Sequence, residues 1–186
     1  MVHLSDWDRS GLETVLVEGD EDNTNLEGQE TTYLVPMQPN GTEVLFITRM
    51  TAHVTWSDET TPPTSLPAIG YTNQPDGFML RIVVQEGIGL WESPLEFNTI
   101  GQSHEITFDV DLVEELGGPV AVANPQGAKY LPEGYVQAAR VDFVVITEDC
   151  GEWTTSDPRP DIGDGGNHYS FQWSVEYQIG STTKGP

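Results

Sequence analysis

Apolar and polar residues alternate with a period of two along most of this chain, which is typical of β-strands that bury one face. The clearest case is residues 168–179, where aromatic and aliphatic side chains alternate with polar ones. Comparable stripes cover 43–56, 78–84, 105–112 and 135–147, and shorter ones cover 14–18, 30–35 and 119–123. The pattern therefore predicts about eight strands.

The more apolar face of each strand predicts the hydrophobic core. Within 43–56, strict alternation places Val44, Phe46, Met50 and Val54 on one face. The same argument, applied to every long strand, predicts a core that contains Phe46, Val54, Leu80, Ile82, Phe108, Val110, Val141, Phe143, Phe171, Trp173 and Val175. The single Cys150 cannot form an internal disulfide, so burial of this core must hold the fold together.

The two longest strands also carry apolar residues on their second face. These residues are Leu45, Ile47, Val136, Val144 and Ile146. An outer face in water is expected to be polar, so apolar residues there indicate that something covers them. A loop of the same chain and a neighbouring subunit are both open as the cover.

Helical patterns are scarce, and the connections are rich in turn residues. Residues 111–118 could form one turn ending at a glycine, but the alternation before them favours a continued strand. The sequence Pro39-Asn40-Gly41 suits a tight turn before the strand at 43. Residues 61–67 and 156–167 are expected to be long loops.

This organisation predicts an all-β fold with a single domain over residues 1–186. The eight-stranded jelly roll fits the number of strands and the long, irregular loops. An immunoglobulin-like sandwich is the alternative, because it needs only about seven strands.

Net charge is the most unusual property of the composition. Thirty acidic residues face seven basic ones, for a formal charge of −23, whereas small domains usually carry a charge of about 2–8 in magnitude. So many carboxylates repel one another in dilute buffer. At 1 M salt the Debye length falls to about 3 Å, which removes most of that repulsion. The composition therefore indicates a halophilic protein.

The charge and its distribution also restrict the partners. Contacts to nucleic-acid phosphates need clustered Lys and Arg, but the five arginines are scattered singly, at positions 9, 49, 81, 140 and 159. Direct binding of DNA or RNA is not expected, and neither is charge-driven docking on an anionic lipid surface. Neither a secretory signal nor an apolar membrane span is recognisable, so we expect a soluble chain.

Chemistry-bearing residues form no recognisable active site. Cys150 lies among carboxylates, which disfavour a reactive thiolate. The acidic segments 20–25 and 161–166 match a calcium loop only in part. No nucleophile elbow, HExxH motif or P-loop is present, although a carboxylate pair for glycoside hydrolysis would leave no linear motif. None of the histidines pairs at metal-ligand spacing: His3, His53, His104 and His168. We predict no enzymatic activity, no cofactor, and no catalytic or metal-binding residue.

The five tryptophans raise a carbohydrate-binding hypothesis, because exposed aromatic rings stack on sugars. Trp56 and Trp173 fall on inward stripes, which leaves Trp7, Trp91 and Trp153 for such a role. A halophilic carbohydrate-binding or cell-surface module is therefore the alternative function.

Two segments in particular, 43–56 (EVLFITRMTAHVTW) and 169–177 (YSFQWSVEY), resemble a known family. These segments, together with the length, the acidity and the strand pattern, make the chain similar to the smaller major capsid protein of icosahedral haloarchaeal viruses with an internal membrane. The resemblance covers essentially the whole chain and contains no catalytic motif. It implies a single jelly roll standing perpendicular to the capsid surface. It further implies that the protein associates with itself and with a larger sister capsid protein in pseudo-hexameric capsomers, together with other virion proteins. These capsomers would lie over a membrane that separates the shell from the genome.

Stability should depend steeply on salt, because the charge of −23 needs screening to keep the fold compact. Circular dichroism in decreasing KCl or NaCl should show loss of β-structure well before salt-free buffer is reached. A melting temperature equal at molar and millimolar salt would contradict the halophilic interpretation.

Overall fold

A computed structural model describes residues 11–57, 70–84, 87–130, 135–137, 139–155, 161–163 and 166–181. These ranges are nearly all β, with thirteen strands and one short α-helix. Eight strands form the two main paths: β1 (Glu13–Asn25), β2 (Glu30–Met37), β3 (Val44–Ser57), β5 (Gly77–Val84), β6 (Gly89–Glu92), β8 (Ser103–Asp111), β10 (Ala139–Asp149) and β13 (Asn167–Gly180). The total exceeds the predicted eight because it includes short strands, described below.

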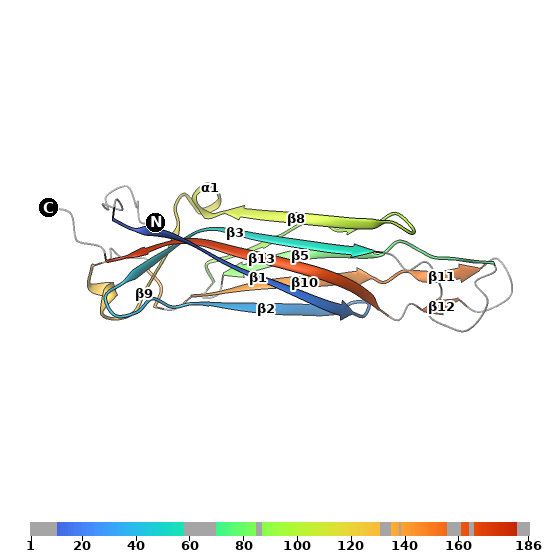
Figure 1. Ribbon diagram of the computed structural model, residues 1–186, viewed down its shortest axis with the longest axis horizontal. Coiled ribbons are helices and arrows are strands. Elements are labelled where there is room, and N and C mark those ends of the chain that lie inside the picture. Colours follow the sequence, from blue (N-terminus) through green and yellow to red (C-terminus); the bar gives the residue numbers. More distant parts are fainter. Residues whose placement is uncertain are drawn as a thin grey trace.

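The two main sheets lie face to face as layers (Figure 1). The first sheet has the order β1-β13-β3-β8, with β9 (Val120–Ala123) also paired to β3. The second has the order β2-β10-β5-β6, with β7 (Glu96–Phe97) also paired to β5. All these pairings are antiparallel.

Strand order identifies the fold. If the eight main strands are numbered along the chain, the sheets read 1-8-3-6 and 2-7-4-5. The first and last strands lie side by side, and successive strands change sheet except for the hairpin of strands 4 and 5, which is the double Greek key of a jelly roll. The predicted fold class is therefore confirmed. Treating all of 1–186 as one domain stays a prediction.

The inward faces of the two sheets form the core. Phe171 on β13 stacks on Tyr33 of β2 with ring centroids 4.7 Å apart, and lies 6.4 Å from the ring of Phe143 on β10. Nine of the eleven predicted core residues are buried, but Phe108 and Trp173 are only partly buried against the core. Phe108 lies on the edge strand β8. Trp173 pairs with Gly19 on the edge strand β1, where its indole occupies the space of a side chain at Gly19.

A β-bulge at Thr48 corrects the predicted register of β3. Glu176 pairs with Arg49 but the next residue, Tyr177, pairs with Ile47, so Thr48 has no opposite partner. Its hydroxyl donates instead to the backbone oxygen of Glu176 at 3.0 Å. One extra residue moves every earlier side chain to the other face of the sheet.

The bulge divides β3 between two apolar clusters. Leu45 and Ile47 belong to the main core, and so do the residues of β3 from Met50 onward that alternate inward. Val44 and Phe46 instead pack with Ala123 in a separate small cluster on the opposite face. The expectation that Val44, Phe46 and Met50 share one face was wrong, because strict alternation does not anticipate a bulge.

A second correction concerns α1 (Leu112–Leu116), which the sequence pattern assigned to a continued strand. Asp111 ends β8 with extended backbone, and its carboxylate accepts hydrogen bonds from the backbone nitrogens of Val113 (2.9 Å) and Glu114 (3.3 Å). This is an N-cap, and Gly117 at φ 75° closes the helix at its other end. Local capping therefore outweighs the alternation that precedes it.

Connections and short strands complete the fold. The turn predicted at 39–41 is confirmed, with Gly41 at φ 52° and the Glu43 nitrogen donating to the Asn40 oxygen at 2.9 Å. A small third sheet joins β12 (Ile162–Gly163), β11 (Glu152–Thr155) and β4 (Tyr71–Thr72), and β11 and β12 lie beyond one end of the main sheets (Figure 1). Strands of two to four residues are too short for a periodic pattern to reveal. The predicted loop 61–67 and most of 156–167 lie outside the described residues.

Buried polar groups close the barrel at the same end. The Asn25 side-chain oxygen accepts from the Thr31 hydroxyl at 2.6 Å, and its amide nitrogen donates to the Val145 backbone oxygen at 3.4 Å. The Tyr169 hydroxyl lies 3.0 Å from that of Tyr33. Burial raises the pKa of Tyr169 far above its ordinary value, so the phenol stays neutral and links the two sheets.

Truncation of Phe171 should test the packing of the core. Phe171→Ala removes a fully buried ring that contacts the opposite sheet, so we expect a cost of about 3–5 kcal/mol in the free energy of unfolding. Phe108→Ala is the matched control and should cost clearly less, because Phe108 is only partly buried. Urea denaturation at molar salt measures both variants, and equal costs would contradict the assigned burial.

Candidate interaction surface

The outward face of the first sheet is strongly acidic. We call it the acidic face and define it by four rows of paired residues: Leu16, Glu18, Asp20 and Asp22 on β1; Ser170, Gln172, Ser174 and Glu176 on β13; Arg49, Thr51, His53 and Thr55 on β3; Glu105, Thr107, Asp109 and Asp111 on β8. Seven carboxylates against one guanidinium give this face a formal charge of −6. Such a face favours hydration.

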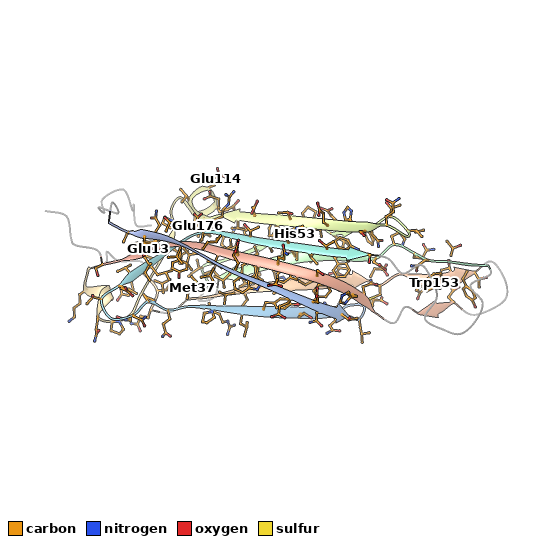
Figure 2. The ribbon with its side chains drawn as sticks, viewed as in Figure 1. Glu13, Met37, His53, Glu114, Trp153 and Glu176 are labelled. Carbon is orange, nitrogen blue, oxygen red and sulfur yellow. The ribbon has the colours of Figure 1, made fainter. Side chains whose placement is uncertain are left out.

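Hydrogen bonds between neighbouring strands hold the polar side chains of the acidic face in place. The Thr51 hydroxyl donates to the Asp109 carboxylate at 2.6 Å, and the His53 ring lies 2.9 Å from the Thr107 hydroxyl. An open hollow of about 520 Å³ lies over this region, lined by Glu18, Asp20, His53, Gln172 and neighbours. Figure 2 shows His53 and Glu176 along this sheet. Its lining also includes Trp173, and the described residues around it do not form a cluster of metal ligands.

The outward face of the second sheet is different in charge and polarity. We call it the neutral face and define it by Glu30, Thr32, Leu34 and Pro36 on β2; Arg140, Asp142, Val144 and Ile146 on β10; Met79, Arg81 and Val83 on β5; Leu90 and Glu92 on β6. Three carboxylates against two guanidinium groups give a formal charge of −1. In a chain with a formal net charge of −23, this face is a region of low charge.

One row of the neutral face ends in exposed leucines on both sides. Leu34 pairs with Asp142, Asp142 pairs with Val83, and Val83 pairs with Leu90. The outer two members are 55% and 58% exposed, for Leu34 and Leu90 respectively. Large aliphatic side chains this exposed, at matching heights on opposite edges of one sheet, form a surface suited to contact with another protein.

Arg81 forms ion pairs with two other strands of the neutral face. From β5 its guanidinium reaches Glu92 on β6 at 2.7 Å and Glu30 on β2 at 3.1 Å. The hydrogen bond to Glu92 is the largest of the interactions that raise the pKa of Arg81 above its ordinary value. The Arg81–Glu30 pair spans the strand that carries Val144 and Ile146, which are 6% and 3% exposed.

A second arginine neutralises the remaining carboxylate of this face. Arg140 donates to both oxygens of Asp142, at 2.6 Å and 2.9 Å, from two residues away on β10. Its pKa is raised mainly by that hydrogen bond. Asp142 itself is buried, and a bidentate pair is the arrangement in which a carboxylate can be withdrawn from water.

The five residues predicted as an exposed apolar interface do not form one. Leu45 and Ile47 are in the main core because of the bulge, and Val136 is partly buried against it. Val144 and Ile146 do face outward, but the strands and side chains beside them leave them buried. They are already buried within the chain by itself, and Arg81 on the neighbouring strand pairs with Val144. Asp at Ile47 would therefore disrupt the core rather than probe an interface.

Sequence reasoning overlooked Leu34 and Leu90. Leu34 alternates with the inward residues Tyr33 and Val35 inside a predicted strand, so its outward position was readable from the pattern. Leu90 lies in the four-residue β6, which was not predicted. That the two leucines share one row is a result of sheet order, which alternation does not give.

Residues considered for catalysis, metals or sugars remain dispersed. His104 lies 2.8 Å from Glu96, and the described residues contain no group of three or more potential metal ligands. Residues 20–25 belong to β1, and His3 and Trp7 lie outside the described residues. Trp153 is buried in the third sheet (Figure 2), and Trp91 packs against the core, so neither presents an open ring. Cys150 is buried, and its thiol donates to the Asn25 backbone oxygen. The absence of an active site stays a prediction.

No helix in the described part of the chain has the length and apolar character needed to cross a membrane.

Comparisons with known proteins find likenesses to structures from viruses. The chain is similar to a chain of the Cowpea mosaic virus top component, a naturally occurring empty particle, with 5% identity, 92% of each chain covered and a TM-score of 0.36. For Broad Bean Stain Virus the identity is 7%, with 91% of this chain and 92% of that chain covered and a TM-score of 0.34. For the decameric BFDV capsid protein the identity is 9%, with 91% and 99% covered and a TM-score of 0.36.

No protein-family model and no curated protein sequence matches the chain. The jelly roll is assigned from its own strand order.

Replacement of Arg81 should separate its packing from its charge. Arg81→Ala removes both the apolar stem and the charge, and we expect a loss of about 1 kcal/mol in the free energy of unfolding. Arg81→Met keeps an apolar stem and should lose less at molar salt, where the exposed ion pairs are screened. Urea denaturation compares the variants, and equal losses would show that the ion pairs, rather than the packing, matter.

Proposed function

We propose that this protein is a structural subunit of a viral capsid, with a mechanical rather than a catalytic role. The observation that carries the proposal is the neutral face. It has a formal charge of −1 and exposed Leu34 and Leu90 at its edges, although the whole chain has a formal charge of −23. A shell protein must contact its neighbours over a large area, and apolar groups with a polar rim are the usual anatomy of such contacts.

The fold is compatible with this role. Jelly rolls occur in viral capsid and lectin domains, so the fold alone allows both functions. The neutral face favours the capsid role because it offers apolar side chains rather than an open aromatic ring. The long, nearly parallel sheets (Figure 1) also present two broad sides through which a barrel can pack beside others.

The more specific proposal is a small major capsid protein of a haloarchaeal virus. The charge of −23 supports a molar-salt environment, and the sequence resemblance supports that family. The protein would pack with a larger sister capsid protein into pseudo-hexameric capsomers of the virion, after synthesis in the host cytoplasm. An internal membrane would lie beneath the shell, with no charge-driven docking and no direct contact between this chain and the genome. Arg81 and Arg140, both engaged by carboxylates, fit that absence.

Salt links the proposed environment to assembly. Two acidic subunits repel each other in dilute buffer, but at molar salt the screening length of about 3 Å confines that repulsion to direct contacts. Apolar contact between neutral faces is not screened. Assembly is therefore expected at high salt and disassembly on dilution.

A carboxylate placed on the neutral face should block assembly without unfolding the chain. Leu34→Asp and Leu90→Asp change exposed positions, so circular dichroism should remain that of the wild type while assembly is lost. Light scattering at molar salt, with the larger sister protein and other virion components supplied, measures assembly.

Leu16→Asp is the matched control, because Leu16 is also 55% exposed but lies on the acidic face. It should assemble like the wild type. If all three variants assemble equally well, the neutral face is not the contact. If the wild type stays monomeric with every partner present, the capsid proposal fails and the carbohydrate-binding alternative gains, which sugar-dependent quenching of tryptophan fluorescence would test.

A further inference from the structure

The neutral face has a pattern that is complementary to itself. Its leucine row runs Leu34, Asp142, Val83, Leu90 from β2 to β6. The adjacent row runs Thr32, Val144, Arg81, Glu92 in the same direction. We propose that this face binds a second copy of the same chain across a two-fold axis parallel to the strands. This inference shares the neutral face with the proposed function and adds the identity of the protein that binds there.

Charge favours this face for self-association over the other. The Coulomb energy between two faces scales with the product of their charges. Two neutral faces have a product of 1, two acidic faces a product of 36, and one of each a product of 6, from charges of −1 and −6. Contact between two neutral faces is therefore the arrangement with the least repulsion in an acidic protein.

The symmetry axis follows from the order of residues across the sheet. Rotation about an axis parallel to the strands reverses the order of the strands but keeps each residue at its height along them. Leu34 of one copy then lies opposite Leu90 of the other, and Leu90 opposite Leu34. Both exposed leucines find an apolar partner at once, which an isologous contact achieves twice by symmetry.

The adjacent row is compatible with the same axis. Glu92 lies opposite Thr32 of the second copy, whose hydroxyl can donate to the carboxylate, and Arg81 lies opposite Val144. In neither row does a carboxylate oppose a carboxylate. Sheets that pack face to face keep their strand directions within about 30° of each other and lie about 10 Å apart, which such an axis allows.

Cross-linking by introduced cysteines tests both the occupant and the axis. One chain carries Leu34→Cys and another carries Leu90→Cys, and the two are mixed at molar NaCl with a bismaleimide cross-linker whose reach of about 10 Å matches the spacing of packed sheets. The proposed axis places position 34 of one copy opposite position 90 of the other, about 10 Å away across the interface. This exceeds the roughly 7 Å between Cα atoms that a direct disulfide tolerates, so a linker is needed. Positions 34 of two copies are about 17 Å apart, because a lateral offset of about 14 Å across three strand spacings adds to the separation of about 10 Å between the sheets.

We expect linked dimer in the mixture on the order of 100-fold faster than in either variant alone, because apposed thiols reach about millimolar effective concentration. Non-reducing gels and mass spectrometry measure it. Wild type controls for the buried Cys150, and a Leu16→Cys chain, 55% exposed on the acidic face, controls for random collision. Sedimentation of the wild type should show a dimer at molar salt that dissociates on dilution of the salt.

Three results would overturn the inference. Linking of the Leu34→Cys chain with itself as fast as in the mixture would refute the axis. Equal linking of the Leu16→Cys chain would refute the face. A monomeric wild type without linking would refute the second copy. In that case the capsid proposal still stands if Leu34→Asp abolishes assembly with virion partners, so the two failures are distinguishable.

Discussion

Burial of the apolar inner faces of two sheets has to outweigh the mutual repulsion of thirty acidic side chains. The aromatic contacts between Phe171, Tyr33 and Phe143 show where this happens, since they join strands of opposite sheets. Because this burial is not screened by ions while the repulsion is, the balance shifts toward the folded state as salt rises. The stability of the fold therefore depends jointly on its surface charge and on the salt concentration around it.

The same balance explains why the carboxylates are unevenly distributed. On the acidic face they project from alternate positions of four strands and remain in water. On the neutral face the carboxylates Glu30, Glu92 and Asp142 are each held by an arginine. With few basic residues available, their concentration on one side of the barrel creates a surface that a neighbouring protein can approach. The proposed assembly follows from that asymmetry rather than from any single contact.

Three local features interrupt the regular alternation of inward and outward side chains along the strands. The bulge at Thr48 turns Leu45 and Ile47 inward while Val44 and Phe46 form a second cluster with Ala123. Asp111 converts the end of β8 into the cap of a helix. Gly19 leaves room for the Trp173 indole at the sheet edge. Each feature changes which side chains are exposed without changing the strand order.

The sequence by itself determined the all-β class, the positions of the long strands and most of the core, because a period of two directly reports which face is buried. It also determined the charge, and with it the expected dependence on salt. The tertiary structure decided the features that depend on neighbouring strands: the bulge in β3, the short strand β6, and the ion pairs of Arg81 with two other strands. Leu34 and Leu90 lie far apart in sequence and share a row only because β10 and β5 lie between their strands. No local pattern encodes that proximity, since it depends on the order of strands in the sheet.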